Sequence, residues 1–152
     1  MNLESYIRDV PDFPREGIMF KDITPLLRDG GAFAQAILEL KNRFADEQIN
    51  TVVAVEARGY ILGAPLAHAM NIGFVPIRKQ GKLPYQTFKF EYDLEYGTDV
   101  IEIHRDALKR DERTLIVDDV LATGGTLEAT AKLVEQTGAK VVGIGLLLEL
   151  IS

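Results

Sequence analysis

Residues 114 to 126 read TLIVDDVLATGGT, and this stretch decides the fold. An apolar run at residues 115 to 117 ends in two adjacent aspartates, and two adjacent glycines follow between threonines. A short, continuous apolar run is typical of a strand that is covered on both faces of a parallel sheet. Because ligands bind at the carboxyl ends of such strands, the stretch predicts a buried strand, a binding loop and the start of a helix.

The loop at residues 122 to 126 has the composition of a phosphate cradle. Its two glycines let backbone N–H groups converge on an anion where the dipole of the next helix begins, and Thr123 and Thr126 add hydroxyl donors. The loop is not the GxxxxGK[ST] motif of nucleotide hydrolases, because Thr126 stands where that motif requires lysine. It does not match the dinucleotide fingerprint either.

The two aspartates, Asp118 and Asp119, need an explanation of their own. Carboxylates beside a phosphate would repel it unless they serve another part of the ligand. Two functional explanations stay open: hydrogen bonds to sugar hydroxyls, or an electrostatic hold on a divalent cation already bound to phosphate. The structural alternative is that one aspartate caps a turn and the other is solvated.

The rest of the chain alternates helices with buried strands. We expect helices over residues 32 to 48, 60 to 70 and 126 to 137, and strands over residues 52 to 55, 73 to 79, 115 to 117 and 141 to 150. Strand-helix-strand units in series predict an α/β fold with a mainly parallel central sheet and helices on both faces.

Two segments depart from this alternation. Residues 81 to 98 have apolar side chains at every second position from Phe88 to Leu94, which predicts a hairpin arm or a flexible flap. Residues 1 to 30 contain several prolines and glycines with little periodicity, which predicts an irregular amino-terminal hood. Together with a core over residues 31 to 152, they are expected to form a single domain.

Composition excludes several functional classes. The chain of 152 residues is 47% hydrophobic, enough for one compact core, and its net charge of -6 argues against a general nucleic-acid binder. It has no cysteine, so a disulfide framework, a thiolate nucleophile and a cysteine zinc site are excluded. Neither a signal peptide nor an apolar stretch of membrane-spanning length is visible, so we expect a cytoplasmic protein with no membrane partner.

The stretch LIVDDVLATGGT resembles the signature of the type I phosphoribosyltransferases. The resemblance implies that fold, with its hood and flap, and phosphoribosyl pyrophosphate as a substrate. The 5-phosphate of that substrate would be bound by Ala122, Thr123, Gly124, Gly125 and Thr126. Asp118 and Asp119 would address the ribose hydroxyls and lie near Mg²⁺, a cofactor that the substrate itself mainly holds.

Four more segments resemble the members of that family that act on adenine: FPREGIMFKDITPLL (13 to 27), VEARGYILGAPLA (55 to 67), IRKQGKLP (77 to 84) and LEYGTDVIEI (94 to 103). The implied reaction is a purine salvage step that forms AMP and pyrophosphate. The resemblance places Phe20 and Lys21 at the adenine, and Glu95 as the catalytic acid/base at its imidazole edge.

The resemblance also implies a pyrophosphate subsite, formed by Arg58, Gly59, Arg78, Lys79, Lys82 and Tyr96. Some of these contacts would come from the other subunit of a homodimer. Cations suit that subsite because negative charge develops on the leaving pyrophosphate while positive charge develops on the ribose. Taken alone, Arg58 is better explained as a surface ion pair with Glu56.

Two alternative functions remain at this point. One is a regulatory protein that senses phosphoribosyl pyrophosphate without catalysis, although residues 1 to 50 contain no basic recognition element. The other is a phosphoribosyltransferase for hypoxanthine, xanthine or orotate. Family members commonly continue past the position of Ser152, which implies a short form or a piece of a longer chain.

Overall fold

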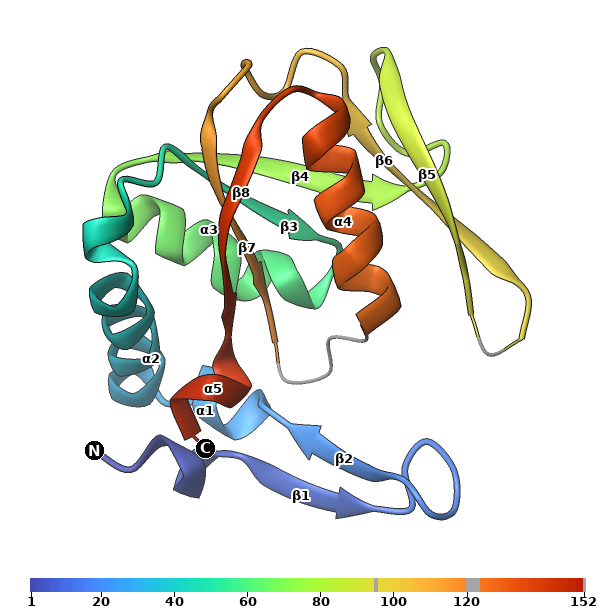
Figure 1. The fold of residues 1–152 in the computed structure, drawn as a ribbon. Helices are drawn as coiled ribbons and strands as arrows, with labels where there is room; N and C mark the ends of the chain where they lie inside the picture. The colour runs from blue at the N-terminus through green and yellow to red at the C-terminus, as the bar shows by residue number, and fades with distance from the viewer. Residues whose placement is uncertain (95, 120–123, 152) are drawn as a thin grey trace.

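The computed structural model of the protein describes residues 1–94, 96–119 and 124–151 and centres on a six-stranded sheet (Figure 1). The strand order is β5-β6-β4-β3-β7-β8. The four parallel strands are β3 (Thr51–Val55), β4 (Gly73–Lys79), β7 (Arg113–Asp118) and β8 (Lys140–Leu146). The antiparallel strands β5 (Thr87–Asp93) and β6 (Thr98–His104) form one edge. The predicted α/β fold with a mainly parallel sheet is therefore confirmed.

Helices cover both faces of this sheet. Leu62 of α3 (Arg58–Met70) packs in one buried cluster with Val52 of β3, and α2 (Gly30–Arg43) contributes to the same cluster. Leu133 of α4 (Gly124–Gln136) packs with Val53 in the second cluster. Val52 and Val53 join different clusters because successive strand residues point to opposite faces.

The helix boundaries differ from the predicted ones at several ends. The Asp29 side chain caps α2 by accepting a 2.9 Å hydrogen bond from the Ala32 amide, but α2 ends at Arg43 and a 3-10 turn, η2 (Ala45–Glu47), replaces its predicted end. Helix α3 begins at Arg58, two residues early, and ends at Met70 as predicted, followed by Asn71 as a C-cap with a left-handed φ of 57°. The helix interiors were predicted correctly, because a buried apolar stripe fixes them.

The predicted strand over residues 141 to 150 is wrong in its second half. Strand β8 ends at Leu146, and Leu147–Ile151 forms the short helix α5. Leucine and glutamate favour helix, and the turn buries Leu147 completely in the cluster that also contains Leu40 of α2. Glu149 also pairs with Arg43 of α2 at 3.0 Å, so α5 is held by tertiary contacts that the apolar run could not reveal.

The hood is more regular than the sequence predicted. It contains a 3-10 turn, η1 (Leu3–Tyr6), a separate antiparallel pair, β1 (Arg8–Pro11) with β2 (Met19–Asp22), and helix α1 (Thr24–Arg28). Strands of four residues are too short to show a clear alternating pattern. Figure 1 places the β1–β2 hairpin beyond the end of the sheet toward which β7 runs.

The predicted hairpin at residues 81 to 98 is present, but its strands reach His104 and it is not a free arm. Phe88, Phe90 and Tyr92 of β5 pack against the cluster that contains Leu133 of α4, whereas Leu94 is exposed. The alternating apolar side chains therefore form the face of β5 that packs against α4. No helix in the described part of the chain is long and apolar enough to cross a membrane.

Candidate active site

Charged side chains gather where β3, β4 and β7 end. Arg58, in the first turn of α3, places its Nε 3.2 Å from the Oδ2 of Asp119, which directly follows β7. The expected alternative, a surface pair between Arg58 and Glu56, is therefore wrong, because Glu56 is engaged by other cations. A residue predicted for pyrophosphate and one predicted for ribose lie side by side, since β3 and β7 are neighbours in the sheet.

The two aspartates differ in exposure but share a hydrogen bond. Asp119 is buried, and the Asp118 Oδ1 accepts a 2.8 Å hydrogen bond from the Asp119 amide. Burial raises the pKa of Asp118, and the neighbouring Asp119 charge adds to that effect. Hydroxyl donors or a divalent cation would stabilise such a pair of carboxylates. Within residues 1–94, 96–119 and 124–151, no group of three or more acidic, histidine or cysteine side chains could hold a metal alone.

The predicted phosphate loop overlaps the start of α4. Gly124, Gly125 and Thr126 lie in the first turn of the helix, which begins two residues before its predicted start; Ala122 and Thr123 lie outside the described residues. The first turn of a helix leaves amide N–H groups without intrahelical partners, and these suit an anion. A Cβ on Gly125 would lie 3.9 Å from the Asp93 carbonyl oxygen, so the helix start lies against the end of the β5–β6 hairpin.

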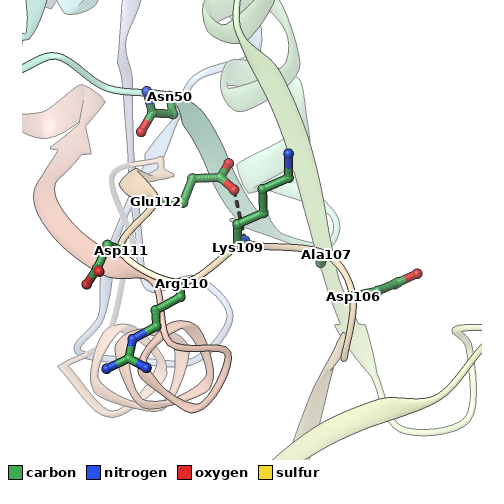
Figure 2. A pocket seen from close by; sticks show the side chains of 7 residues that line it. All are labelled: Asn50, Asp106, Ala107, Lys109, Arg110, Asp111 and Glu112. Carbon is green, nitrogen blue, oxygen red and sulfur yellow. Dashed lines mark hydrogen bonds between the residues drawn. The ribbon is translucent and has the colours of Figure 1, made fainter.

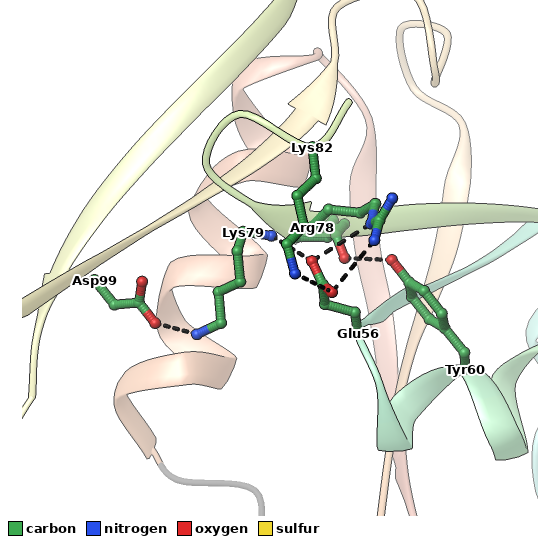
Figure 3. Close-up of polar contacts among 7 residues, drawn as sticks. Glu56, Tyr60, Arg78, Lys79, Lys82 and Asp99 are labelled. Atoms are coloured by element: carbon green, nitrogen blue, oxygen red, sulfur yellow. Dashed lines mark hydrogen bonds and ion pairs between the residues drawn. The ribbon is translucent and has the colours of Figure 1, made fainter. Parts of the chain in front are cut away.

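Residues 78 to 82, which contain three of the cations predicted for pyrophosphate, contact Glu56, which follows β3 (Figure 3). The Lys79 amide donates to Glu56 Oε1 at 2.7 Å, Lys82 Nζ donates to Oε2 at 3.0 Å, and Arg78 Nε lies 3.4 Å from Oε1. Burial alone would raise the pKa of Glu56, but the contacts from Lys79, Lys82 and Arg78 outweigh it and lower that pKa to about 2. The peptide bond from Glu56 to Ala57 is cis.

Two further contacts fix the end of β4. The Lys79 ammonium forms an ion pair with Asp99 of β6, and the Tyr60 hydroxyl of α3 donates to the Ile77 carbonyl oxygen at 2.6 Å (Figure 3). Burial, together with the Glu56 charge, raises the pKa of Tyr60 to about 12, so this donor stays protonated. Sequence reasoning missed Asp99 and Tyr60, because their partners come from other elements of the sheet.

Of the remaining predicted site residues, Phe20 and Lys21 lie in the hood and Tyr96 lies between β5 and β6. Phe20 of β2 packs edge-on against Phe13, with ring centroids 5.0 Å apart, and Lys21 forms an ion pair with Asp9 inside the hood hairpin. Tyr96 is 79% exposed next to Glu95, which lies outside the described residues.

Gly59 lies deep in the fold, at the start of α3. A Cβ there would lie 3.2 Å from the Val117 carbonyl oxygen and 3.2 Å from the Ala54 Cβ. The absence of a side chain therefore lets α3 approach β3 and β7, and this approach is what brings Arg58 to Asp119.

A surface hollow elsewhere does not resemble a catalytic site (Figure 2). Its lining residues come from the segment before β7 and the residue before β3: Asn50, Asp106, Ala107, Lys109, Arg110, Asp111 and Glu112. Figure 2 shows the Lys109 and Arg110 side chains pointing apart, and Glu112 accepts a 2.9 Å hydrogen bond from the Lys109 amide. The two cations do not converge on a common position. The hollow lies at the amino ends of β3 and β7, whereas Arg58 and Asp119 lie at their carboxyl ends.

The chain is similar to known proteins over nearly all of its length. Residues 19–150 match the family described as Phosphoribosyl transferase domain. The chain is 59% identical to an adenine phosphoribosyltransferase of Maridesulfovibrio salexigens, over 99% of this chain and 88% of that protein.

Solved structures agree with this similarity. Adenine phosphoribosyltransferase from Thermoanaerobacter pseudethanolicus superposes with a TM-score of 0.91 at 51% identity, over 95% of this chain and 84% of that one. The Saccharomyces cerevisiae enzyme, solved with adenine and an imino-altritol bisphosphate, gives a TM-score of 0.89 at 40% identity, with the same two coverages. This chain therefore belongs to the phosphoribosyltransferase family and, within it, to the adenine phosphoribosyltransferases.

Proposed function

We propose that this protein transfers the 5-phosphoribosyl group of phosphoribosyl pyrophosphate to adenine, yielding AMP and pyrophosphate in a purine salvage step. The observation that carries the proposal is the 59% identity to an adenine phosphoribosyltransferase over 99% of the chain. The protein would thus be a glycosyltransferase of the pentosyl type.

The proposed chemistry is a displacement at the anomeric carbon of the ribose. An imidazole nitrogen of adenine forms the new bond to that carbon, and the bond from the carbon to the pyrophosphate oxygen breaks. Glu95 takes the proton that leaves the attacking nitrogen. Phe20 and Lys21 of the hood bind the purine, and Asp118 and Asp119 hold the ribose hydroxyls.

Anion binding divides between two sets of groups. The amides at the start of α4, with the loop before them, bind the 5-phosphate. Arg58, Lys79, Lys82 and Arg78 stabilise the charge that develops on the leaving pyrophosphate, with Gly59 and Tyr96 beside them. The presence of several cations near one strand end supports this division.

Magnesium is proposed to arrive with the substrate phosphates. The carboxylates of Asp118 and Asp119 are hard oxygen donors of the kind Mg²⁺ prefers, and two carboxylates with substrate oxygens make a sufficient set. When bound, the ion neutralises charge on the pyrophosphate. We further propose a cytoplasmic homodimer in which basic residues of one subunit reach the site of the other, with no nucleic-acid or membrane partner.

A base-panel assay tests the function. The protein is incubated with phosphoribosyl pyrophosphate, Mg²⁺ and, separately, adenine, hypoxanthine, guanine, xanthine or orotate, and nucleotide and pyrophosphate are measured. We expect AMP and pyrophosphate in equal amounts from adenine. If only another base yields a nucleotide, that base replaces adenine as the proposed substrate. If phosphoribosyl pyrophosphate binds but no base yields a product, the regulatory function is favoured.

A further inference from the structure

Glu56 lies against a strongly basic segment, residues 78 to 82, which we call the basic turn. Its carboxylate meets this turn at the Lys79 amide, the Lys82 ammonium and the Arg78 guanidinium, at 2.7, 3.0 and 3.4 Å (Figure 3). The Glu56 side chain is only 13% exposed, whereas the Arg78 and Lys82 side chains are 38% and 48% exposed. The acid thus lies behind the cations.

A second carboxylate, that of the buried Glu102, also contacts the basic turn. Glu102 of β6 accepts a 2.7 Å hydrogen bond from the Gly81 amide, and Gly81 has a φ of +85°. Glu102 also accepts from the Thr87 hydroxyl at 2.8 Å. The backbone of the turn is therefore held at Gly81 by Glu102 and at Lys79 by Glu56, and of these two carboxylates only Glu56 also contacts the charged ends of Arg78 and Lys82.

A carboxylate at this position solves an electrostatic problem. Two cations aimed at one ligand repel each other while the ligand is absent, and a carboxylate between them offsets that repulsion. The contacts with Glu56 do not exhaust the cations, because an ammonium has three N–H donors and a guanidinium has five. Arg78 and Lys82 can therefore keep Glu56 and still donate to an incoming anion.

We propose that Glu56 is a positioning residue, which holds Arg78 and Lys82 ready for the diphosphate group without touching it. The inference rests on the proposed function, since that function supplies the diphosphate. The proposal predicts that the negative charge of Glu56 strengthens anion binding at this subsite, although a negative charge by itself repels an anion.

Calorimetric titration of Glu56→Gln with Mg²⁺-pyrophosphate, and separately with AMP, tests the proposal. Glutamine keeps the shape and one acceptor oxygen but loses the charge. We expect about tenfold weaker pyrophosphate binding, the size of one lost charge-assisted contact, with unchanged AMP binding. The KM for phosphoribosyl pyrophosphate should rise by a similar factor, with kcat changing less.

The matched control is Asp111→Asn, which also neutralises a carboxylate paired with a lysine, Lys140 at 3.7 Å, but at the far end of the sheet. It should leave both affinities unchanged. Equal or tighter pyrophosphate binding by Glu56→Gln would overturn the proposal, and so would an equal loss of pyrophosphate and AMP affinity, which indicates general damage.

If Glu56→Gln does not fold, Glu56→Asp replaces it. Aspartate keeps the charge but retracts the carboxylate by one methylene group, so pyrophosphate affinity should fall several-fold while AMP affinity stays; unchanged pyrophosphate affinity would refute the role. The proposed function is tested separately: it is wrong if the wild-type protein binds pyrophosphate in these titrations but forms no AMP. A wild-type protein that binds no pyrophosphate contradicts the positioning role directly.

Discussion

Arg58 Nε lies 3.2 Å from the Oδ2 of Asp119, so the first turn of α3 and the residue after β7 are joined by an ion pair. The arginine side chain is 50% exposed, whereas the aspartate side chain is 2% exposed. The exposed cation can turn toward a ligand while the carboxylate stays in the fold. The pair thus connects the proposed pyrophosphate and ribose subsites.

Arg58→Gln is expected to weaken pyrophosphate binding by about tenfold or more, because a charge-assisted contact to phosphate is lost. Titration with Mg²⁺-pyrophosphate measures this loss. In a double-mutant cycle with Asp119→Asn, the two effects should not add, because the residues touch. Arg43→Gln, which removes an arginine of similar exposure from its pair with Glu149 outside the site, is the control, and an equal loss in that variant would refute a direct role for Arg58.

Lys79→Gln should also weaken pyrophosphate binding by about tenfold, whereas Asp99→Asn should change it by less than about threefold. The ammonium survives in the second variant and loses only its partner on β6. The same titration measures both. If Asp99→Asn is as damaging as Lys79→Gln, then the ion pair, and not the free ammonium, is what the ligand requires.

Elements with a clear pattern of apolar residues were predictable from the sequence. The strands that contain Val52 and Leu115 were predictable because each has a continuous apolar run, and both side chains are completely buried. The change from strand to helix at Leu147 was not predictable, because an apolar run has the same composition in both forms. What decides it is the contact of α5 with α2, more than a hundred positions apart in the chain.

The residues of the candidate site could be proposed from the sequence, but their pairing could not. Resemblance singled out Arg58, Lys79 and Lys82, yet their partners Asp119, Asp99 and Glu56 depend on which strands are neighbours. The pairing of β6 with β4 brings Asp99 toward Lys79, and no local motif encodes that register. Charge partners across a sheet therefore need the fold.

Glu95→Gln should lower kcat by about a hundredfold or more while the affinity for phosphoribosyl pyrophosphate changes little, since general-base catalysis typically contributes that much. Steady-state kinetics and a separate binding titration measure the two quantities. Glu91→Gln, an exposed carboxylate on the same hairpin, is the control. Unchanged turnover in Glu95→Gln would leave positioning alone to explain the rate.

Acid should reduce the stability difference between the wild-type protein and Glu56→Gln. The pKa of Glu56 is lowered from 4.5 to about 2, so its ionised form stabilises the folded state above pH 4.5, and this contribution is lost as the pH falls toward 2. Glutamine does not titrate. Denaturant unfolding at several pH values should show the largest difference near neutrality, and a difference independent of pH would show that the carboxylate's charge does not stabilise the fold.

Gly63→Ala should lower the free energy of unfolding by about 1–3 kcal/mol, because an overpacked contact forces a buried helix outward. A Cβ at Gly63 of α3 would lie 3.1 Å from both the Ala54 Cβ and the Phe74 ring, whereas a Cβ at Gly30 of α2 would have open space. Gly30→Ala is thus the matched control, with an expected change within about 0.5 kcal/mol. Because α3 carries Arg58 into the site, an outward shift should also weaken pyrophosphate binding. If Gly63→Ala changes the free energy of unfolding no more than Gly30→Ala does, close packing of α3 on β3 is not what positions Arg58.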